Sequence, residues 1–372
     1  MKHLYRVGKN STDVLIVGAG PAGLMIACQL SLFNISFRII DKKSCFSVHS
    51  GAMIVHARTL EVFRQMGLAD KMLEQGRVVK TLSVYFNGKK TARLNLSGKA
   101  SQLSGYPFIM MLEQSKTEQL LIEYLQQKGH RVEWKTELTD VIQHDEKVTV
   151  NLILPDSQRE NVTSDYLVAA DGSKSSVRQF LNIPFEGKTH DTSLFIIECD
   201  ADIPLPSGEI CFSFSKRATT GFFPLLGESL RIDATIRKFH GRSHRLTFET
   251  VQKVFNLKTK LNANIRNPQW FSVFHSHGRC AQSFRMNRCI LVGDAAHLFT
   301  PVGGQGMNTG LQDAYNLAWK LAMVLQKRIQ PQLLDTYETE RKPVAIITCR
   351  SSDRFFKLAA SGNLFLDRKS VV

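Results

Sequence analysis

Aliphatic runs alternate with helical patterns near both ends of the chain. Residues 14–17, 166–170 and 289–292 are short apolar runs of the kind that form the buried strands of a parallel sheet. Each run leads directly into a glycine or an Asp-Gly pair, and a helical pattern follows it. This order of strand, turn and helix predicts an α/β fold, with a Rossmann-like parallel sheet covered by helices.

The middle of the chain has a different pattern, in which apolar and polar residues alternate over short segments. A two-residue period is typical of antiparallel strands that bury one face. An earlier hairpin, residues 81–96 with its turn at Asn87-Gly88, interrupts the α/β order and is expected to belong to a different sheet. The strands that we expect in the middle are residues 194–198, 210–214, 222–226, 230–236 and 270–274, with one helix near 246–255.

The chain is therefore expected to pass more than once between two domains. Residues 1–78, 106–184 and 285–372 form a discontinuous α/β domain with C-terminal helices, and residues 79–105 and 185–284 form a mainly antiparallel sheet that covers a ligand. Six phenylalanines of this sheet are candidate wall residues, although any one of them is more typical of ordinary core. They are Phe212, Phe214, Phe222, Phe223, Phe271 and Phe274.

The first aliphatic run leads into the motif Gly18-x-Gly20-x-x-Gly23. Gly18 allows a sharp turn, Gly20 leaves room for a pyrophosphate against bare backbone, and Gly23 allows the helix to pack close to the sheet. That helix directs its N-terminal N–H groups at the phosphates. A second strand, residues 37–40, ends in Asp41, where a carboxylate can accept hydrogen bonds from an adenosine ribose. The spacing predicts a dinucleotide site.

Two more acids follow buried strands. Asp171 and Gly172 come directly after the second aliphatic run, and Asp294 is separated from the third run by a single glycine. Open α/β sheets bind ligands at this carboxyl edge, so both acids are candidate ligand contacts. The alternative for Asp171 and Gly172 is an ordinary turn with a serine cap. Residues 303–308, a glycine-dense loop ahead of a long helix, offer backbone N–H groups to an electron-rich ligand.

Two polar residues stand at the starts of predicted helices between these motifs. The spacing of Arg58 leaves two interpretations open, a contact with cofactor phosphate or an ordinary surface arginine. Ser115 and Glu118 match a capping box, which would explain Glu118 without any ligand. The same box does not explain Gln114, which remains a candidate site residue.

The composition is that of a globular protein. The chain has 372 residues, of which 43% are hydrophobic and 22% are charged. Its seven scattered cysteines show no metal-binding spacing and are expected to be reduced residues, mostly in the core. The first ten residues lack the apolar core of a signal peptide, and no apolar run is long enough to span a membrane. We therefore expect a cytoplasmic location.

The net charge of +15 does not by itself indicate a nucleic-acid partner. The basic residues are mostly scattered doublets, whereas a nucleic-acid binder concentrates them on one element with aromatic residues between them. The densest basic stretch, residues 236–245, is expected to be a solvated loop or a steering field for anionic ligands. Contact with an acidic membrane surface stays open, and so does the oligomeric state.

These motifs together resemble those of the FAD-dependent aromatic hydroxylases, the class A flavoprotein monooxygenases of the para-hydroxybenzoate and phenol hydroxylase type. The resemblance spans nearly the whole chain, and an Asp-Gly pair followed later by GDAAH is specific to that family. The stretches that carry it are VGAGPAGL (17–24), ARTLE (57–61), Gln114 with Glu118 and Leu121, ADGSKSSVR (170–178), LVGDAAHLFTPVGGQGMNTGLQDAYNLAWKL (291–321) and YETERKP (337–343).

The resemblance implies non-covalently bound FAD and assigns roles residue by residue. The pyrophosphate would lie on Gly18, Ala19, Gly20, Pro21, Ala22 and Gly23, the adenosine ribose on Asp41, and adenine on the backbone of Val141. Arg58 and Gln114 would flank the phosphate and ribityl chain, Asp171 and Gly172 would serve FAD and the pyridine nucleotide, and Asp294 would bind the ribityl chain or pyrophosphate. Pro301 and the loop containing Gly306 would lie beside the isoalloxazine, with the backbone of Met307 and Asn308 donating to its N1–C2 edge. For His297 we expect a structural role.

The activity implied by the resemblance is hydroxylation of a phenolic or polycyclic aromatic small molecule. NAD(P)H would donate the electrons and O₂ the oxygen, through a C4a-hydroperoxyflavin. Because the cofactor performs the difficult step, we assign no catalytic acid, base or nucleophile. The alternatives are Baeyer–Villiger oxidation, epoxidation or antibiotic modification on the same fold, or an FAD-binding sensor or scaffold that no longer hydroxylates.

Two departures from the family pattern bear on these expectations. Many relatives have a basic residue where Gly51 stands here, so one flavin contact is expected to be missing or replaced. The motifs are most similar to those of larger phenol-hydroxylase-like members, which continue into a thioredoxin-like C-terminal domain. This sequence stops at Val372, so we expect either a compact member or a shortened one.

Overall fold

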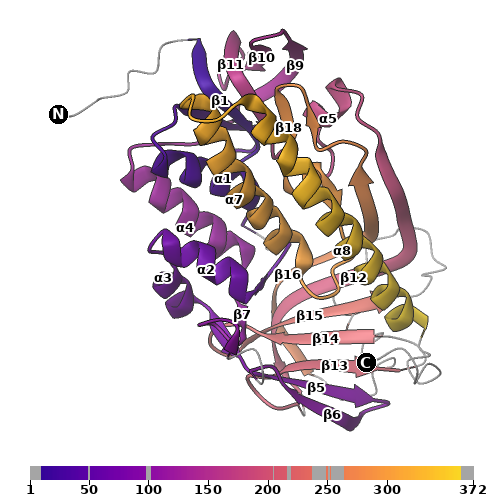
Figure 1. Cartoon of the computed structure of the whole chain (residues 1–372). Helices are drawn as coiled ribbons and strands as arrows, with labels where there is room; N and C mark the ends of the chain where they lie inside the picture. The colour runs from indigo at the N-terminus through magenta and orange to yellow at the C-terminus, as the bar shows by residue number, and fades with distance from the viewer. Residues whose placement is uncertain are drawn as a thin grey trace.

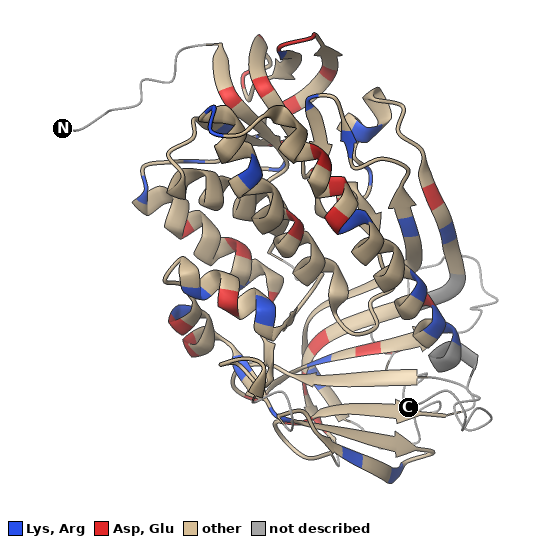
Figure 2. Cartoon of the chain, in the orientation of Figure 1, with Lys and Arg blue, Asp and Glu red and all other residues tan. Residues whose placement is uncertain are grey.

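The computed structural model describes residues 10–48, 51–97, 102–203, 205–215, 219–236 and 264–361, together with Glu249 and Gln252. Most of the helix expected near 246–255 and almost all of the basic stretch 236–245 lie outside these residues. Figure 1 shows an α/β part next to a long antiparallel sheet, with the helix α8 running along both. Figure 2 shows Lys and Arg in separate patches over both parts, with Asp and Glu between them.

The first sheet has a parallel centre. Aliphatic β1 lies between β2 and β11, and all three run in the same direction, as does β18 beyond β11. The order is β17-β18-β11-β1-β2-β8, with β9 and β10 added as an antiparallel extension of β11. The bounds are β1 Ser11–Val17, β2 Phe37–Asp41, β8 Glu133–Trp134, β9 Glu137–Gln143, β10 Val148–Ile153, β11 Arg159–Ala169, β17 Arg285–Met286 and β18 Cys289–Leu291.

Helices pack on this sheet and on one another. The helix α1 contacts both α4 and α7, and α8 packs against α7 and the second sheet. The bounds are α1 Pro21–Leu32, α2 Ala57–Gln65, α3 Ala69–Gln75, α4 Gln114–Gln127, α5 Ser176–Phe180, α7 Gln305–Leu325 and α8 Asp335–Ser361, with 3₁₀ turns η2 Gly293–Ala295 and η3 Pro331–Leu334. Between strands and helices lies the main apolar core, which extends from Val14 to Ala345.

The second sheet is mainly antiparallel, as the two-residue alternation predicted. Its order is β19-β16-β12-β15-β14-β13-β5-β6, in which β5 pairs with β13 in parallel. The hairpin at Asn87-Gly88 therefore belongs to a different sheet from the α/β core, as expected. The bounds are β5 Thr81–Phe86, β6 Lys89–Asn95, β12 Phe185–Asp202, β13 Ile210–Phe214, β14 Thr219–Pro224, β15 Ser229–Ile236, β16 Asn264–Ala281 and β19 His297–Leu298.

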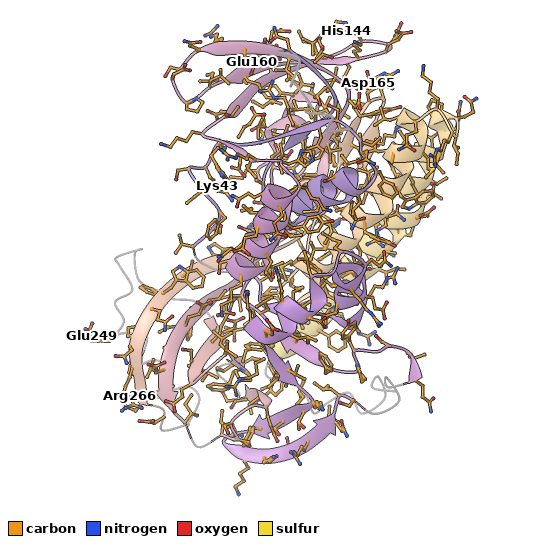
Figure 3. All side chains as sticks on the ribbon, turned by 90° about the vertical axis from the view of Figure 1, so that its left-hand side faces the viewer. Lys43, His144, Glu160, Asp165, Glu249 and Arg266 are labelled. Carbon is orange, nitrogen blue, oxygen red and sulfur yellow. The ribbon has the colours of Figure 1, made fainter. Side chains whose placement is uncertain are left out.

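Two of these strands are much longer than the alternation indicated. β12 and β16 have 18 residues each, and their pairing shifts register between Thr189 and Ser193 and again between Glu198 and Asp200. Irregular pairing breaks the strict period of two, so the sequence pattern shows only the regular middle of each strand. In the side view of Figure 3, Arg266 of β16 lies near one end of the molecule and Glu160 of β11 near the other.

A small third sheet joins the two parts. It consists of β3 Ile54–Val55, β7 Ile109–Met111 and β4 Arg77–Val79, all paired antiparallel. Met53, Ile54 and Met111 pack with Ile210 and Phe223 of the second sheet in one apolar cluster. One face of the second sheet is therefore directed toward the α/β part. The opposite face carries another cluster, which includes Phe195, Ile197 and Phe222.

All seven cysteines are free, and four of them, Cys28, Cys199, Cys211 and Cys289, are buried. Four of the seven thus lie in the core. No helix in the described part of the chain combines the length and the apolar character that a membrane-spanning helix needs.

Candidate cofactor-binding site

The glycine turn between β1 and α1 has the geometry that its sequence predicted. Gly18 has φ of +102°, and a Cβ there would lie 2.3 Å from the Ala170 carbonyl oxygen. A Cβ on Gly23 would lie 1.9 Å from the Gly18 oxygen, so only glycine permits this close approach. A Cβ on Gly20, in contrast, would meet nothing within 4 Å. The open space is therefore in front of Gly20, at the N-terminus of α1.

Asp41 stands at the end of β2 and is buried against this turn. Its Oδ2 accepts a hydrogen bond from Ala19 N at 2.8 Å, and its Oδ1 accepts one from Lys43 N at 2.9 Å. The carboxylate thus fixes the backbone of the glycine turn. Each oxygen retains a second lone pair with which a ribose hydroxyl can bond.

Asp171 follows β11, and one of its carboxylate oxygens is buried without a hydrogen-bond partner in the described part of the chain. Its Oδ2 accepts from Val177 N at 3.2 Å, whereas its buried Oδ1 has no partner among the described residues. Burial raises the pKa of Asp171, although the hydrogen bond from Val177 N lowers it in part. The neighbouring Gly172 has φ of +82°, and a Cβ there would meet open space. A buried acceptor without a partner next to open backbone is typical of a ligand site.

The serine-cap alternative is also realised at this turn. Ser175 is the N-cap of α5 and accepts a hydrogen bond from Arg178 N at 3.0 Å. The cap explains Ser175, but it leaves Oδ1 of Asp171 unexplained. The Arg178 side chain bonds to the carbonyls of Ala295 and Ser173, which connects the Asp171 turn to the turn after β18.

The turn after β18 lies directly against α1 and α7. A Cβ on Gly293 would lie 3.1 Å from Cβ of Ala22, and a Cβ on Gly310 would lie 3.1 Å from Cα of Gly293. Three segments far apart in the sequence therefore meet through their smallest residues. Asp294, next to Gly293, lies at the open edge of this turn. Desolvation by the surrounding protein raises its pKa, and the nearby His297 lowers it.

The glycine-dense loop supplies the N-terminus of α7. Gly303 and Gly304 both have positive φ, and a Cβ on Gly304 would lie 2.5 Å from Cβ of Ile54. The helix begins at Gln305, so the N–H groups of Gln305, Gly306 and Met307 have no acceptor within the helix. A Cβ on Gly306 would meet nothing within 4 Å. Pro301, at the start of the loop, is exposed.

Asn308 is buried and its side chain is used within the protein. Its Oδ1 accepts from His56 N at 2.9 Å and from Thr59 Oγ1 at 2.7 Å, and its Nδ2 donates to the Ile54 and Gly304 carbonyls. In a regular helix its own N–H bonds to the Gly304 carbonyl. Of the two residues expected to donate backbone N–H groups here, Met307 is therefore the better placed.

His297 has the structural surroundings that we expected. Its ring is buried, with Nε2 2.6 Å from Asp313 Oδ2, and Asp313 Oδ1 accepts from Arg341 Nε at 2.7 Å. The last motif, YETERKP, supplies Arg341 to this group, and its Tyr337 donates to the Leu291 carbonyl. Both residues thus support the turn after β18 from α8.

Three residues that were expected to contact FAD have hydrogen-bond or ion-pair partners within the protein. Arg58 pairs with Glu61 at 2.9 Å and lies over the Tyr315 ring. Val141 is in β9, and its N–H donates a hydrogen bond to Asp140 Oδ1. Within the described residues we find no hydrogen bond that joins Val141 to the glycine turn. Gln114 uses its amide within the protein, accepting from Ala52 N and donating to Glu118 Oε1.

The capping box predicted at Ser115 and Glu118 is wrong. The helix α4 begins at Gln114 with Glu113 as its N-cap, so Ser115 already lies in the first turn. Glu118 instead accepts from Ser47 N and from Gln114, and thereby holds the segment that follows β2. Burial raises the pKa of Glu118, and these two hydrogen bonds lower it. The motif spacing was correct, but a tertiary contact replaced the local one.

Sequence reasoning missed Gly310 and Arg231. An isolated glycine inside a helical pattern, such as Gly310, is a known signal for close packing. Arg231 gave no such signal, because it occupies a polar position in an ordinary alternating strand. Its buried side chain donates from Nη2 to the Gly51 carbonyl at 3.0 Å. A guanidinium from the second sheet thus holds the backbone at Gly51.

The residues present fit FAD, on three observations. A buried acceptor of Asp171 lacks a partner, and the surfaces before Gly20 and Gly306 would remain open even if a Cβ were added. The N-termini of α1 and α7 provide free N–H groups and the positive ends of two helix dipoles. One elongated ligand with an anionic centre and an electron-rich ring matches this arrangement.

The comparison with known families agrees with the fold and the site. The model of the family described as FAD binding domain matches residues 11–352. The chain therefore belongs to the FAD-binding flavoproteins, and within them to the FAD-dependent aromatic hydroxylases.

Two curated relatives and one solved structure illustrate the similarity. The 6-methylpretetramide 4-monooxygenase of Streptomyces rimosus is 38% identical over 338 residues, which cover 89% of this chain and 59% of the relative. The pentachlorophenol 4-monooxygenase of Sphingobium chlorophenolicum is 31% identical, with 89% and 62% covered. The flavin-dependent monooxygenase PieE, solved with FAD and substrate, has a TM-score of 0.83 and 25% identity, with 92% and 63% covered. This chain thus spans about three-fifths of these proteins.

Proposed function

We propose that this chain is a flavin-dependent monooxygenase that hydroxylates a phenolic or polycyclic aromatic compound, with NAD(P)H as electron donor and O₂ as oxygen source. The observation that carries the proposal is the contact of Ala22, Gly293 and Gly310, which brings two open helix N-termini to one edge of the sheet. The names of the two relatives, a pentachlorophenol and a 6-methylpretetramide monooxygenase, support the aromatic substrate class.

When bound, FAD supplies the chemistry of hydride transfer and O₂ activation. The backbone before Gly20 binds the pyrophosphate, and the carboxylates of Asp41, Asp171 and Asp294 accept hydrogen bonds from hydroxyl groups of the cofactor. The free N–H groups at Gln305, Gly306 and Met307 would stabilise negative charge that develops on the ring system of the bound cofactor. The second sheet excludes water from the side that faces these N–H groups.

The test is to purify the protein with added FAD and to record its visible spectrum. Oxidation of NADH and of NADPH is then followed with phenol, 1-naphthol and larger polycyclic phenols, in buffer equilibrated with ¹⁸O₂. We expect retained flavin, oxidation accelerated by at least one compound, and one labelled oxygen in its ring hydroxyl. Label in an ester or epoxide indicates another oxygen insertion. Retained FAD without any accelerating compound contradicts the hydroxylase and favours a non-hydroxylating flavoprotein.

A further inference from the structure

Three charged residues form a compact group on the second sheet. Arg231 and Asp233 alternate onto the same face of β15, and Glu198 of β12 is directly opposite Arg231. Nε of Arg231 donates to Asp233 Oδ1 at 2.8 Å, and its Nη1 lies 3.7 Å from Glu198 Oε1. Arg231 is 2% exposed, whereas the Asp233 side chain is 21% exposed. The motifs that identified the cofactor site do not include any of these residues.

This face of the sheet is the one directed toward the cofactor site. Arg231 donates from the same face to the Gly51 carbonyl of the α/β part. Phe223, directly opposite Arg231 on β14, packs in one cluster with Ile54. Ile54 is also the residue against which Gly304, the N-cap of α7, is packed. A chain of packed residues therefore runs from the start of α7 to Arg231, next to Asp233.

Aromatic rings lie next to Asp233 on that surface. Gly221 is directly opposite Asp233, and Phe212 is directly opposite Gly221 on the next strand. A Cβ on Gly221 would lie 2.6 Å from the Phe223 ring, so this glycine gives the ring its place against the strand. Phe212 and Phe223 meet edge to face, with centroids 5.7 Å apart. Asp233 thus lies beside apolar aromatic side chains.

The phenylalanines that the sequence suggested as wall residues do not all lie on the same face of the sheet. Phe212, Phe214 and Phe223 share the face of Asp233. Phe222 is on the opposite face and fully buried in its apolar cluster, because neighbouring residues of a strand alternate between faces. Phe271 is 39% exposed. A ligand on the cofactor side can contact the first three but not Phe222.

The charge of the group restricts what such a ligand can be. Nε, Nη2 and Nη1 of Arg231 already face Asp233, Gly51 and Glu198, and two carboxylates accompany one guanidinium. Burial raises the pKa of Asp233, and Arg231 lowers it. A carboxylate that has lost part of its hydration gains from accepting a hydrogen bond. A further anion brought to this place would be repelled.

We propose that Asp233 accepts a hydrogen bond from a hydroxyl group of the substrate, and that the chain therefore selects neutral, hydroxyl-bearing aromatic compounds over carboxylated ones. Arg231 acts as the positioning residue that holds the Asp233 carboxylate in place. The inference rests on the proposed function, because it takes the aromatic compound to lie between this face and the start of α7. It adds the substrate group that is recognised and the residue that recognises it.

The test measures binding rather than turnover. Isothermal titration calorimetry compares 1-naphthol, 1-methoxynaphthalene and 1-hydroxy-2-naphthoate on the protein with FAD supplied and, separately, without FAD. A hydrogen bond to a carboxylate predicts that 1-naphthol binds about tenfold or more tightly than the methyl ether. In Asp233→Asn this ratio should fall severalfold and the naphthoate should bind more tightly, since the negative charge is gone. Asp202→Asn, an exposed acid of β12 paired with Arg266, is the matched control and should keep the wild-type ranking.

A second variant keeps the test interpretable if Asp233→Asn alone does not fold. Arg231→Gln combined with Asp233→Asn removes both charges together and keeps an amide donor for the Gly51 carbonyl, and it should show the same loss of ranking. An unchanged ratio in a folded variant overturns the inference, and so does a wild-type protein that binds none of the three probes or prefers the ether or the naphthoate. Intact ranking without flavin retention or turnover contradicts only the proposed function. Turnover with unchanged ranking in Asp233→Asn contradicts only the role of Asp233.

Discussion

His297 and Asp313 meet in the interior, with the ring Nε2 2.6 Å from the carboxylate Oδ2, and both side chains are fully buried. Asp313 also accepts a hydrogen bond from Gly293 N at 3.3 Å, so this one carboxylate holds the turn after β18 at two points. Arg341 of α8 bonds to its other oxygen. The position of the GDAAH turn thus depends on a buried acid that is not part of the open surface.

Replacing Asp313 should destabilise the fold strongly. Asp313→Asn leaves Arg341 without its carboxylate in a buried place, and breaking a buried ion pair costs about 3–5 kcal/mol. Asp335→Asn is the control, because Asp335 pairs with Arg285 at the surface with its side chain 69% exposed. The control should lose less than about 1 kcal/mol. Urea unfolding measures both, and equal losses in the two variants would contradict the role of Asp313.

The stability that Asp313 confers should depend on pH in a defined direction. Burial alone would raise the pKa of Asp313, but His297 and Arg341 hold it below its ordinary value of 3.8. An acid with a lowered pKa stabilises the fold above its unfolded-state pKa, and this contribution is lost as the pH falls through the lower, folded-state value. The difference between wild type and Asp313→Asn should therefore be constant above about pH 5 and shrink in stronger acid. A difference that grows as the pH falls would rule out this account.

Substitutions at two glycines of the first turn should mainly affect different properties, stability at Gly23 and FAD binding at Gly20. Gly23→Ala places a Cβ 1.9 Å from the Gly18 oxygen and should cost about 1–3 kcal/mol or more in the free energy of unfolding. Gly20→Val enters open space, so the fold should lose only about 1 kcal/mol, as expected of a poor N-cap residue. The valine should nevertheless abolish FAD retention, since it fills the space of the pyrophosphate. Thermal melting and the flavin absorbance of purified variants measure the two effects. A yellow Gly20→Val protein would refute this placement of the pyrophosphate.

Asp171 should cost stability in the FAD-free protein. Its pKa is raised mainly by burial, so the folded state carries an energetic cost that is fully present above the raised pKa and is relieved as the pH falls and the group is protonated. Asp171→Asn should therefore be at least as stable as wild type near pH 7, and the gap should close in acid. The same variant should show weaker FAD retention or a weaker response to NAD(P)H, since an amide replaces the carboxylate. Asp202→Asn, measured in parallel, should change neither property.

Arg38 of β2 connects strands β8 and β11 of the first sheet through two glutamates. It is buried and forms bidentate contacts with Glu133 at 2.6 and 2.8 Å and with Glu160 at 2.8 and 3.0 Å. Glu133 and Glu160 raise the pKa of Arg38. Arg38→Leu leaves two partly exposed acids unpaired, and we expect a loss of about 2–3 kcal/mol. Adding Glu160→Gln should recover part of this loss in a double-mutant cycle, whereas Arg266→Leu on the exposed Asp202 pair should cost less than about 1 kcal/mol.

The sequence by itself determined the local structure around the cofactor site. Gly18, Gly23 and Gly304 are required by backbone conformation or close approach within one turn, and such requirements are visible as residue types at fixed spacing. The aliphatic runs and the two-residue alternation likewise determine which segments are parallel strands and which are antiparallel. Only the tertiary structure decided which distant residues meet. Glu118 matched a capping box and yet bonds to Ser47, and Arg231 reaches Gly51 from another sheet. These contacts join residues 71 and 180 positions apart, and no local spacing records them because each depends on how whole sheets and helices pack.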